Sequence, residues 1–498
     1  MTITADLTRY PLAAETQKYL ESVTFGHVID GEVVPSASGE TFPIVEPSSG
    51  EEIGRAASGG PEDVERAVAS ARAAFDDGRW RFLAPLEKER RLRRLSQLFA
   101  EWGPVFSDLD VLDAGLLKPY TGFIVQAALD GLDYYAGWPT KIAGTIPAVP
   151  DDVAVYVVRE PVGVVGIIVP WNGPAFVVNF VAAALACGNS VILKPAEQTP
   201  MSATLIGQLC AEAGIPAGVV NVLHGTGQNV GGPLVEHPGV DAIGFTGSVE
   251  TGKRIQAAAA KRVKSVALEL GGKSAHIVFD DADLDPAAMA CTMAVWGASG
   301  QVCTAGTRVL VQKGIYDDFV DRMAGLSRDL RIGSPFDPDT NVGPVVSDVQ
   351  LERIAGYVAI GAEEGATLAL GGKRHGDKGY FFEPTIFTGV QNTMRIAQEE
   401  IFGPVMCAIP FETEEEAYRI ANDTEYGLAA GVWTNHLARA HRAARTLRAG
   451  TVWVNTYQEV HMSVPYGGVK QSGHGRSLGE ESIRELTQTK SVWMKVAR

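Results

Sequence analysis

Short apolar runs alternate with helical segments between residues 162 and 270, and this alternation restricts the fold more than any other feature of the chain. The runs are GVVGIIV (163–169), SVILK (190–194), GVVNVLH (218–224), DAIGFTG (241–247) and SVALEL (265–270). Helical patterns follow from residue 175 and at 202–213, 230–236 and 250–261. Buried strands that alternate with helices in this way predict right-handed βαβ units in a doubly wound parallel sheet.

A second α/β domain is expected in the C-terminal half. The alternation continues less regularly from residue 274 to about residue 466, and 498 residues exceed what one hydrophobic core usually holds. Two helices are predicted ahead of the first strand, at 60–75 and 86–99. Strand-like segments at 148–161 and 487–496 fit neither series, and we expect the terminal one to pair, for example with another subunit.

Charge and cysteine content exclude several classes of function. The net charge of −16 argues against a nucleic-acid partner, because phosphate binding requires a basic surface. Five widely spaced cysteines form no C-x-x-C pair, which favours a reducing compartment and argues against structural zinc. The N-terminus carries no signal-peptide pattern, and the longest apolar stretch, residues 175–187, is shorter than the ~20 residues that span a bilayer. We expect a soluble, cytoplasmic protein that binds no metal and no membrane.

The loops that follow the strands are where a ligand should bind, since doubly wound sheets bind ligands at the carboxyl ends of their strands. GFTGS places Gly247 at a turn and Ser248 at a helix N-terminus, which suits a pyrophosphate. An ordinary turn between a strand and a helix would have the same sequence pattern. KPAEQ places Lys194 and Glu197 after another strand, where the carboxylate would bind ribose hydroxyls or simply form a surface ion pair. GTGQNVGG, which contains Gly227, lacks the G-x-G-x-x-G spacing and is a weak signal.

Two further strand ends carry candidate catalytic groups. PWNGP holds Asn172 between prolines, where the amide either donates to an oxyanion or belongs to a turn. ELGGK holds Glu269 at the last strand of the series, where a buried carboxyl with a raised pKa would serve as a general base or join a structural ion pair.

One cysteine has unusual neighbours. Cys303 lies in GQVCTAGT among small and polar residues, whereas a structural cysteine usually keeps apolar company. Local sequence leaves two interpretations open, a loop cysteine without a role and a nucleophile at a backbone bend. Small polar neighbours suit the second, because an apolar environment would raise the thiol pKa.

Taken together, these motifs resemble the aldehyde dehydrogenase superfamily. The similarity runs from about residue 31 to residue 496, with PWN, LKPAEQTP, GFTGS, ELGGKS, GQ-x-C, EEIFGPV, NDTEYGLAAGVWT and PYGGVKQSGHGRSLG in order. It implies that Cys303 attacks an aldehyde, that Asn172 and the Cys303 N–H hold the oxyanion, and that Glu269 activates the water that releases the acid.

The resemblance also implies an NAD site and a homodimer or homotetramer. Adenosine ribose would meet Lys194 and Glu197, and the charge of Glu197 favours NAD, with NADP as a poorer alternative. The other implied cofactor residues are Ser248 at the pyrophosphate, Glu400 and Phe402 at the nicotinamide ribose, and Ile168, Trp171, Gly227, Gly247 and Leu270 along the cleft.

The substrate tunnel departs from the common pattern of the family. Gly173 replaces an aromatic residue, and Phe180, Val460 and Tyr466 fall at other tunnel positions. None of the four is basic, so we expect a medium-sized or bulky apolar aldehyde, aliphatic or aromatic. A CoA-acylating or semialdehyde dehydrogenase is the alternative, followed by a non-catalytic binding relative; Glu269 argues against acyl transfer to CoA.

The family architecture implies three parts. They are a discontinuous NAD-binding domain (1–142 and 160–271), a catalytic domain (272–470) and a small β oligomerisation element (143–159 and 487–498).

Overall fold

A parallel sheet with helices on both faces forms the N-terminal half of the molecule. The computed structural model describes residues 3 and 6–496, and this sheet has the strand order β18-β10-β9-β6-β7-β8-β1-β2. The five apolar runs form its parallel centre, as β6 (Val164–Ile168), β7 (Ser190–Lys194), β8 (Val220–Val222), β9 (Ala242–Gly247) and β10 (Ser265–Leu270). The doubly wound α/β fold predicted from the alternation is therefore confirmed.

Antiparallel strands extend this sheet at both edges. They are β1 (His27–Ile29) and β2 (Glu32–Val34) beside β8, and β18 (Gly473–His474) beside β10. The strand order reverses between β9 and β6, and this switch point lies where such sheets bind ligands.

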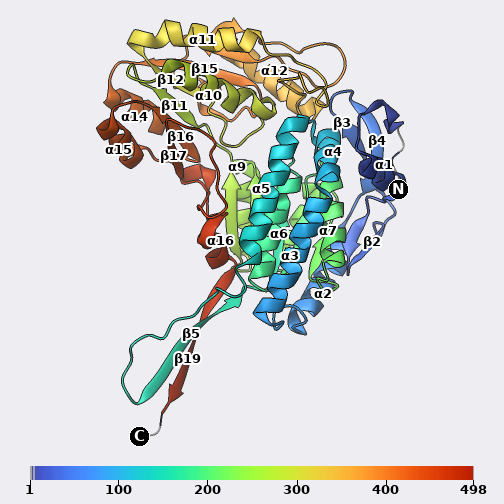
Figure 1. The fold of residues 1–498 in the computed structure, drawn as a ribbon. Coiled ribbons are helices and arrows are strands. Elements are labelled where there is room, and N and C mark those ends of the chain that lie inside the picture. The colour runs from blue at the N-terminus through green and yellow to red at the C-terminus, as the bar shows by residue number, and fades with distance from the viewer. Residues whose placement is uncertain (1–2, 4–5, 497–498) are drawn as a thin grey trace.

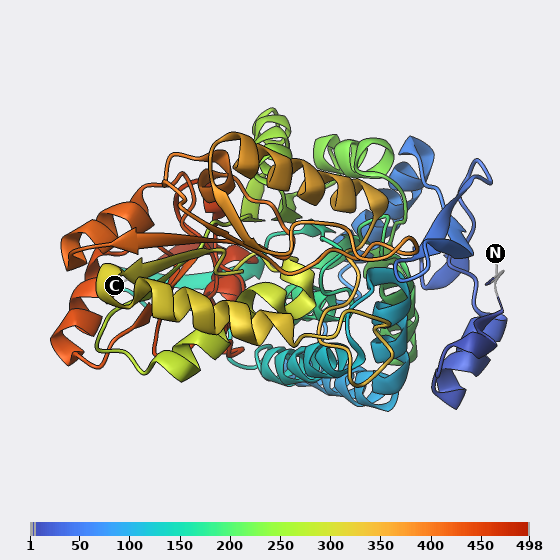
Figure 2. The ribbon, with the colours of Figure 1, turned by 90° about the horizontal axis from the view of Figure 1, so that it is seen from above.

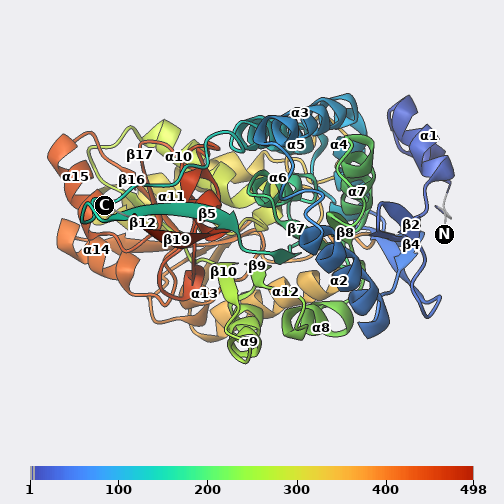
Figure 3. The ribbon, with the colours of Figure 1, turned by 90° about the horizontal axis from the view of Figure 1, so that it is seen from below.

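Helices cover the two faces of the sheet, as the view from below shows (Figure 3). One layer contains α3 (Pro85–Glu101), α4 (Gly103–Ala114), α5 (Lys118–Ala136), α6 (Val178–Ala186) and α7 (Met201–Glu212). The other contains α2 (Pro61–Asp76), α8 (Gly232–Glu236) and α9 (Val249–Ala260). The helices predicted at 60–75 and 86–99 are thus confirmed as α2 and α3, whereas α4 and α5 were not predicted.

Buried aspartates on α4 organise this layer. Asp108 accepts from the N–H of Ala13, which precedes α1 (Ala14–Ser22). Asp110 accepts from the N–H of Ala175, the first residue of the short helix η2 (Ala175–Val177), and Asp113 accepts from the N–H of Met201 at the start of α7. Carboxylates satisfy the free donors at a helix start, so one helix caps three others.

The C-terminal half contains the second α/β unit that the sequence predicts. Its seven strands are β13 (Thr367–Leu370), β14 (Thr385–Thr388), β15 (Val405–Phe411), β12 (Arg308–Gln312), β11 (Ala275–Val278), β16 (Ala429–Trp433) and β17 (Thr451–Val454), in sheet order. Its helices are α10 (Leu284–Trp296), α11 (Tyr316–Arg328), α12 (Asp348–Glu363), α13 (Arg395–Gln398), α14 (Glu414–Asn422) and α15 (Leu437–Thr446). Seen from above, this yellow-to-red half packs beside the blue-to-green half (Figure 2).

A two-stranded ribbon projects from the body of the molecule (Figure 1). Its strands β5 (Val153–Pro161) and β19 (Thr487–Lys495) pair antiparallel from Pro161–Thr487 to Val153–Lys495. The strand-like segments singled out in the sequence therefore pair with each other. The ribbon exposes the large apolar side chains of Tyr156, Trp493 and Met494.

The remaining elements are β3 (Thr41–Glu46) and β4 (Glu51–Ala57), which form a hairpin, and α16 (Gly479–Glu485) before the ribbon. Residues 1–2, 4–5, 497 and 498 of the predicted domains lie outside the described residues, and the domain boundaries remain predictions. Within residues 3 and 6–496, no helix is both long and apolar enough to cross a bilayer. The same part of the chain contains no cluster of three or more His, Cys, Asp or Glu side chains placed to hold a metal.

Candidate active site

The predicted ligand residues come from neighbouring strand ends of the first sheet. Trp171 and Asn172 follow β6, Lys194 ends β7 and Glu197 follows it, and Ser248 follows β9. Glu269 is near the end of β10, which pairs in parallel with β9 up to Leu270. The residues therefore gather along one edge, as the strand-end rule requires.

The cysteine loop bends sharply just before Cys303. Ala298, Ser299 and Gly300 all have left-handed backbone, with φ of 47°, 54° and 74°. A Cβ on Gly300 would lie 2.1 Å from the carbonyl oxygen of Gly403, so only glycine fits there. Asn172 crosses to this loop and donates from Nδ2 to the backbone oxygen of Gln301, at 2.9 Å. The predicted oxyanion donor therefore contacts the chain two residues before the predicted nucleophile.

The Cys303 sulfur lies 3.2 Å from the hydroxyl oxygen of Tyr466. Burial raises the pKa of the Cys303 thiol to about 11, and the nearby carboxylates of Glu400 and Glu269 add to the rise. The expectation that small polar neighbours would keep this pKa low is wrong, because the folded chain buries the loop and places two carboxylates near it.

Glu269 has the environment expected of a general base. Its Oε1 accepts from both the N–H and the hydroxyl of Ser477, each at 3.2 Å, while its buried Oε2 has no hydrogen-bond partner within the described residues. Burial raises the pKa of Glu269 to about 8, although the two bonds from Ser477 oppose the rise. Among the described residues Glu269 forms no ion pair, and its role as a general base stays a prediction.

Lys194 and Glu197 are next to each other at the end of β7. The Lys194 side chain is 3% exposed, and its ammonium donates to the Pro195 carbonyl and lies 3.5 Å from Glu197. Glu197 is 40% exposed, so its carboxylate is available to a ligand. The pair is therefore half buried and differs from an ordinary surface ion pair.

Ser248 caps α9 by accepting from the Thr251 N–H. The N-terminus of α9 therefore lies at the same edge of the first sheet as the other predicted ligand residues. Gly247 has no room for a side chain, because a Cβ there would be 2.5 Å from the Phe245 ring. Gly227 is exposed and begins the short helix η3 (Gly227–Gly231), which Thr226 caps by accepting from the Asn229 N–H. These residues fit the phosphate-binding part of a dinucleotide site.

Glu400 and Phe402 close the other side of the site. Glu400 Oε1 accepts from the Gly272 N–H at 3.1 Å, and a Cβ on Gly271 would come within 2.0 Å of Glu400 Oε2. The Phe402 ring meets Trp171 edge-on at 5.7 Å, and the buried indole N–H of Trp171 has no partner within the part of the chain described. Ile168 and Leu270 are buried at the ends of β6 and β10. An unpaired donor and a close-packed carboxylate fit a polar cofactor bound in this cleft.

The predicted tunnel residues have different environments. A Cβ on Gly173 would meet Phe176 at an ordinary 3.7 Å, and Phe176 packs edge-on against Phe180. Val460 is 47% exposed, and the Tyr466 hydroxyl reaches the cysteine sulfur. The sequence interpretation missed three nearby groups: Ser477, Tyr120 and Tyr457. Ser477 belongs to PYGGVKQSGHGRSLG, whose loop-like composition gave no chemical signal.

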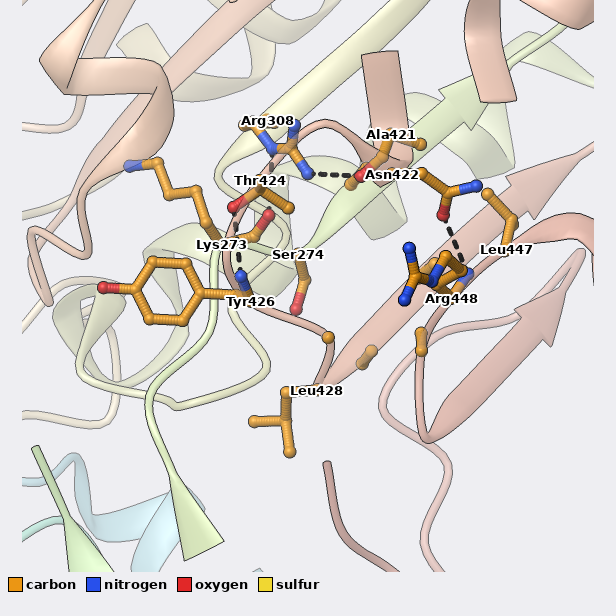
Figure 4. A pocket seen from close by; sticks show the side chains of 15 residues that line it. Lys273, Ser274, Arg308, Ala421, Asn422, Thr424, Tyr426, Leu428, Leu447 and Arg448 are labelled. Carbon is orange, nitrogen blue, oxygen red and sulfur yellow. Dashed lines mark hydrogen bonds between the residues drawn. The ribbon is translucent and has the colours of Figure 1, made fainter. Parts of the chain in front are cut away.

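A small cavity lies in the second α/β unit (Figure 4). Its volume is about 20 Å³, and none of its 15 lining residues belongs to the predicted catalytic or cofactor set. Arg308 donates to the carbonyl of Ala421 across it, whereas the ammonium of Lys273 points away from that contact. Lys273 is buried and burial lowers its pKa to about 8. The cavity holds a water at most and is not a substrate site.

Comparison with known proteins agrees with this geometry. The family model described as the aldehyde dehydrogenase family matches residues 33–492. The chain belongs to the aldehyde dehydrogenase family. Among curated relatives of this dehydrogenase, benzaldehyde dehydrogenase from Antirrhinum majus is 44% identical, covering 93% of this chain and 88% of the relative.

Two solved structures show the same fold. Indole-3-acetaldehyde dehydrogenase from P. syringae, in complex with NAD+ and IAA, has a TM-score of 0.94 at 43% identity, covering 97% of this chain and 99% of the other. An NAD+ complex of the Bacillus cereus aldehyde dehydrogenase has a TM-score of 0.96 at 40% identity, covering 98% and 100%. The resemblance drawn from the motifs and the enzyme class are confirmed, while the roles of single residues stay predictions.

Proposed function

We propose that this aldehyde dehydrogenase oxidises an apolar aldehyde to its carboxylic acid with NAD, through a thioester on Cys303. The observation that carries the proposal is the contact between Asn172 Nδ2 and the Gln301 carbonyl oxygen, which brings an amide donor beside the cysteine loop. Nucleophile, oxyanion donor and general base then belong to one site, which is the arrangement that acyl transfer requires.

In the first half-reaction, the ionised sulfur of Cys303 bonds to the carbonyl carbon and the carbonyl π pair moves onto oxygen. The second N–H of the Asn172 amide and the Cys303 backbone N–H would hold that oxyanion. A bound NAD would supply the hydride acceptor that turns the adduct on Cys303 into a thioester as the carbonyl re-forms. Lys194, Glu197, Ser248, Glu400 and Phe402 would hold the cofactor, and Ile168, Trp171, Gly227, Gly247 and Leu270 would line it.

In the second half-reaction, Glu269 removes a proton from water, which attacks the thioester and expels the Cys303 thiolate. The unpaired Oε2 of Glu269 is the atom available to this water. Its raised pKa makes the carboxylate a stronger base than an exposed one. A dedicated base favours hydrolysis over transfer to CoA.

The cofactor preference is proposed from Glu197. Its carboxylate would face the adenosine ribose and repel a 2′-phosphate, so NAD should be preferred and NADP should be the poorer alternative. The NAD+ complexes of two structural relatives support this choice.

An apolar substrate is supported by the tunnel residues Gly173, Phe180, Val460 and Tyr466, none of which could pair with a substrate carboxylate. Two of the relatives are named for aromatic aldehydes, benzaldehyde and indole-3-acetaldehyde. We propose an aldehyde of that size and polarity.

Assembly and location are also proposals. The projecting ribbon with its exposed Trp493 and Met494 supports a homodimer or homotetramer. All five cysteines are free, which is compatible with the reducing cytoplasm.

The test is an NADH-absorbance assay with a panel of aldehydes, run with and without CoA, on the wild type and on Cys303→Ala. We expect turnover that needs no CoA in the wild type, and none in Cys303→Ala, with NAD affinity nearly unchanged. Turnover by Cys303→Ala would overturn the assignment of the nucleophile, and a requirement for CoA would overturn hydrolysis.

A further inference from the structure

Tyr466 was predicted as an apolar wall of the substrate tunnel, but its hydroxyl group faces the reacting sulfur. The Oη–Sγ distance of 3.2 Å lies within the range of a hydrogen bond to sulfur. No other side chain of the described residues is recorded in a hydrogen bond to this sulfur. The contact therefore involves an atom that takes part in the proposed reaction.

The position of Tyr466 is fixed by the segment that also holds the base. Its N–H donates to the Ser477 carbonyl at 2.7 Å, and the Ser477 N–H donates back at 2.8 Å. Ser477 in turn donates to Glu269 through both its N–H and its hydroxyl. Between them, a Cβ on Gly467 would lie 2.7 Å from Glu269 Oε1. One backbone bridge thus presents a hydroxyl to the nucleophile and another to the base.

The direction of the hydrogen bond follows from the protonation states of the sulfur and the phenol. Glu269 on β10 and Glu400, before β15, disfavour a thiolate, and the rings of Tyr120 on α5 and Tyr457, after β17, lie near it. Burial raises the pKa of Tyr466 far above its usual value, so the phenol keeps its proton. A thiolate carries no proton to donate, so in that state Tyr466 must be the donor.

We propose that Tyr466 is a catalytic residue that donates a hydrogen bond to the Cys303 thiolate and so increases the reactive fraction of the enzyme. The proposal rests on the proposed function, since it assumes that Cys303 is the nucleophile. Ionisation releases the thiol proton to solvent, and the hydroxyl stabilises the sulfur anion that remains. The bond weakens when sulfur becomes bonded to carbon, so the benefit is confined to the free nucleophile.

The experiment compares Tyr466→Phe with the wild type in the rate of Cys303 alkylation by iodoacetamide between pH 6.5 and 10.5, followed by mass spectrometry of the intact protein. Loss of a hydrogen bond to a charged group should slow alkylation about tenfold wherever the rate rises with pH. This is equivalent to raising the apparent pKa of the Cys303 thiol by about one unit. Because the pKa of Cys303 is about 11, both proteins stay on the rising part of the profile up to pH 10.5, so the difference in rate should persist over the whole range.

Tyr457→Phe is the matched control. Its hydroxyl donates to the carbonyl of Thr304 at 2.7 Å, so the variant loses a tyrosine hydroxyl beside the same loop without touching the sulfur. Its alkylation rate should stay within about twofold of wild type. Equal rates for Tyr466→Phe and wild type at every pH would overturn the proposal, as would an equal loss in both variants, since that would indicate a loosened loop.

The two proposals fail in different ways. If Cys303 is not the nucleophile, Cys303→Ala still turns over aldehyde and alkylation does not inactivate the wild type. If only the role of Tyr466 is wrong, Cys303→Ala is inactive while Tyr466→Phe alkylates like the wild type. Unchanged thermal midpoints and NAD affinity in Tyr466→Phe show that the fold and the cofactor site are intact.

Discussion

Glu269 combines burial, one satisfied oxygen and one free oxygen, and this combination leads to a prediction about the second half-reaction. Glu269→Gln should complete the first half-reaction, up to hydride transfer, and then stall at the thioester, because water is no longer deprotonated. Steady-state turnover should fall by about 10²–10⁴-fold, the usual effect of losing a general base. Mass spectrometry should show an acyl adduct on Cys303 that accumulates to about one per subunit.

The same carboxyl predicts a pH dependence. Its pKa of about 8 means that the base form grows as the pH rises through 8, so hydrolysis-limited turnover should rise over that range. Glu485→Gln is the control, since Glu485 is exposed and affects Glu269 only through its charge. Unchanged steady-state turnover in Glu269→Gln would refute its role as the base.

Gly173 allows a test of the substrate class. In the wild type, kcat/KM should rise from acetaldehyde to at least hexanal, because one buried methylene contributes roughly 1–3 kcal/mol in an apolar pocket. Gly173→Phe should flatten or reverse this rise by filling the tunnel, whereas Gly173→Ala, which adds one methyl group with space around it, should keep it. If acetaldehyde or a carboxylate-bearing semialdehyde is the best wild-type substrate, the inference from the tunnel is wrong.

Sequence reasoning could name Cys303, Glu269 and Asn172 because each follows a recognisable pattern. It could not find the hydroxyl of Tyr466 at the Cys303 sulfur or that of Ser477 at the Glu269 carboxylate, since both contacts join segments more than 160 residues apart. The high pKa of Cys303 was missed for the same reason. Local sequence shows the small neighbours of the thiol but not the two carboxylates that other segments bring near it.

Among the elements, those with a clear local pattern could be predicted and those that depend on distant partners could not. β6 to β10 are continuous apolar runs, and α2 shows an apolar stripe at helical spacing. The strands β1, β2 and β18 have two or three residues each and exist by pairing with strands already in place. The helix α4 buries Asp108, Asp110 and Asp113, so the usual polar face of a surface helix is missing from its sequence.

The α4 aspartates predict how stability depends on pH. Burial raises the pKa of Asp110 to about 7, so the folded state favours its protonated form. Its contribution to the free energy of unfolding is therefore full below the pKa of an unfolded aspartate, about 3.9, and is lost as the pH rises through 7. Asp110→Asn, which stays neutral, should gain about 2–4 kcal/mol relative to wild type between pH 4.5 and pH 8.

Urea unfolding of both proteins at several pH values measures this difference. The neighbouring Asp113 remains in both proteins, but the charge of Asp110 contributes to its raised pKa, so the measured difference includes the loss of this repulsion. Parallel stability curves for Asp110→Asn and wild type would show that Asp110 is ionised at all these pH values.

At the scale of the whole molecule, the ribbon of β5 and β19 is too small a sheet to be stable without further contacts. A two-stranded sheet is marginally stable in water, and this one exposes 64% of Trp493 and 47% of Met494. Trp493→Glu should therefore weaken assembly, and light scattering after gel filtration should show a smaller species than wild type. Leu437→Glu, an equally drastic change at a 73% exposed position on α15, should leave the mass unchanged. Equal masses for all three proteins would show that the ribbon does not contribute to assembly.

Because β18 pairs with β10, this edge of the first sheet cannot be completed until the ribosome has synthesised β18. Leu268 and Glu269 on β10 are joined to His474 and Gly473, roughly 200 residues later in the chain. At about 5–20 residues per second, that edge of the first sheet waits on the order of 10–40 seconds for its last strand. An uncovered strand edge invites pairing with other chains, so nascent copies are most prone to aggregate during this interval. The strand that carries Glu269 is thus also the last strand of this sheet to gain its neighbour.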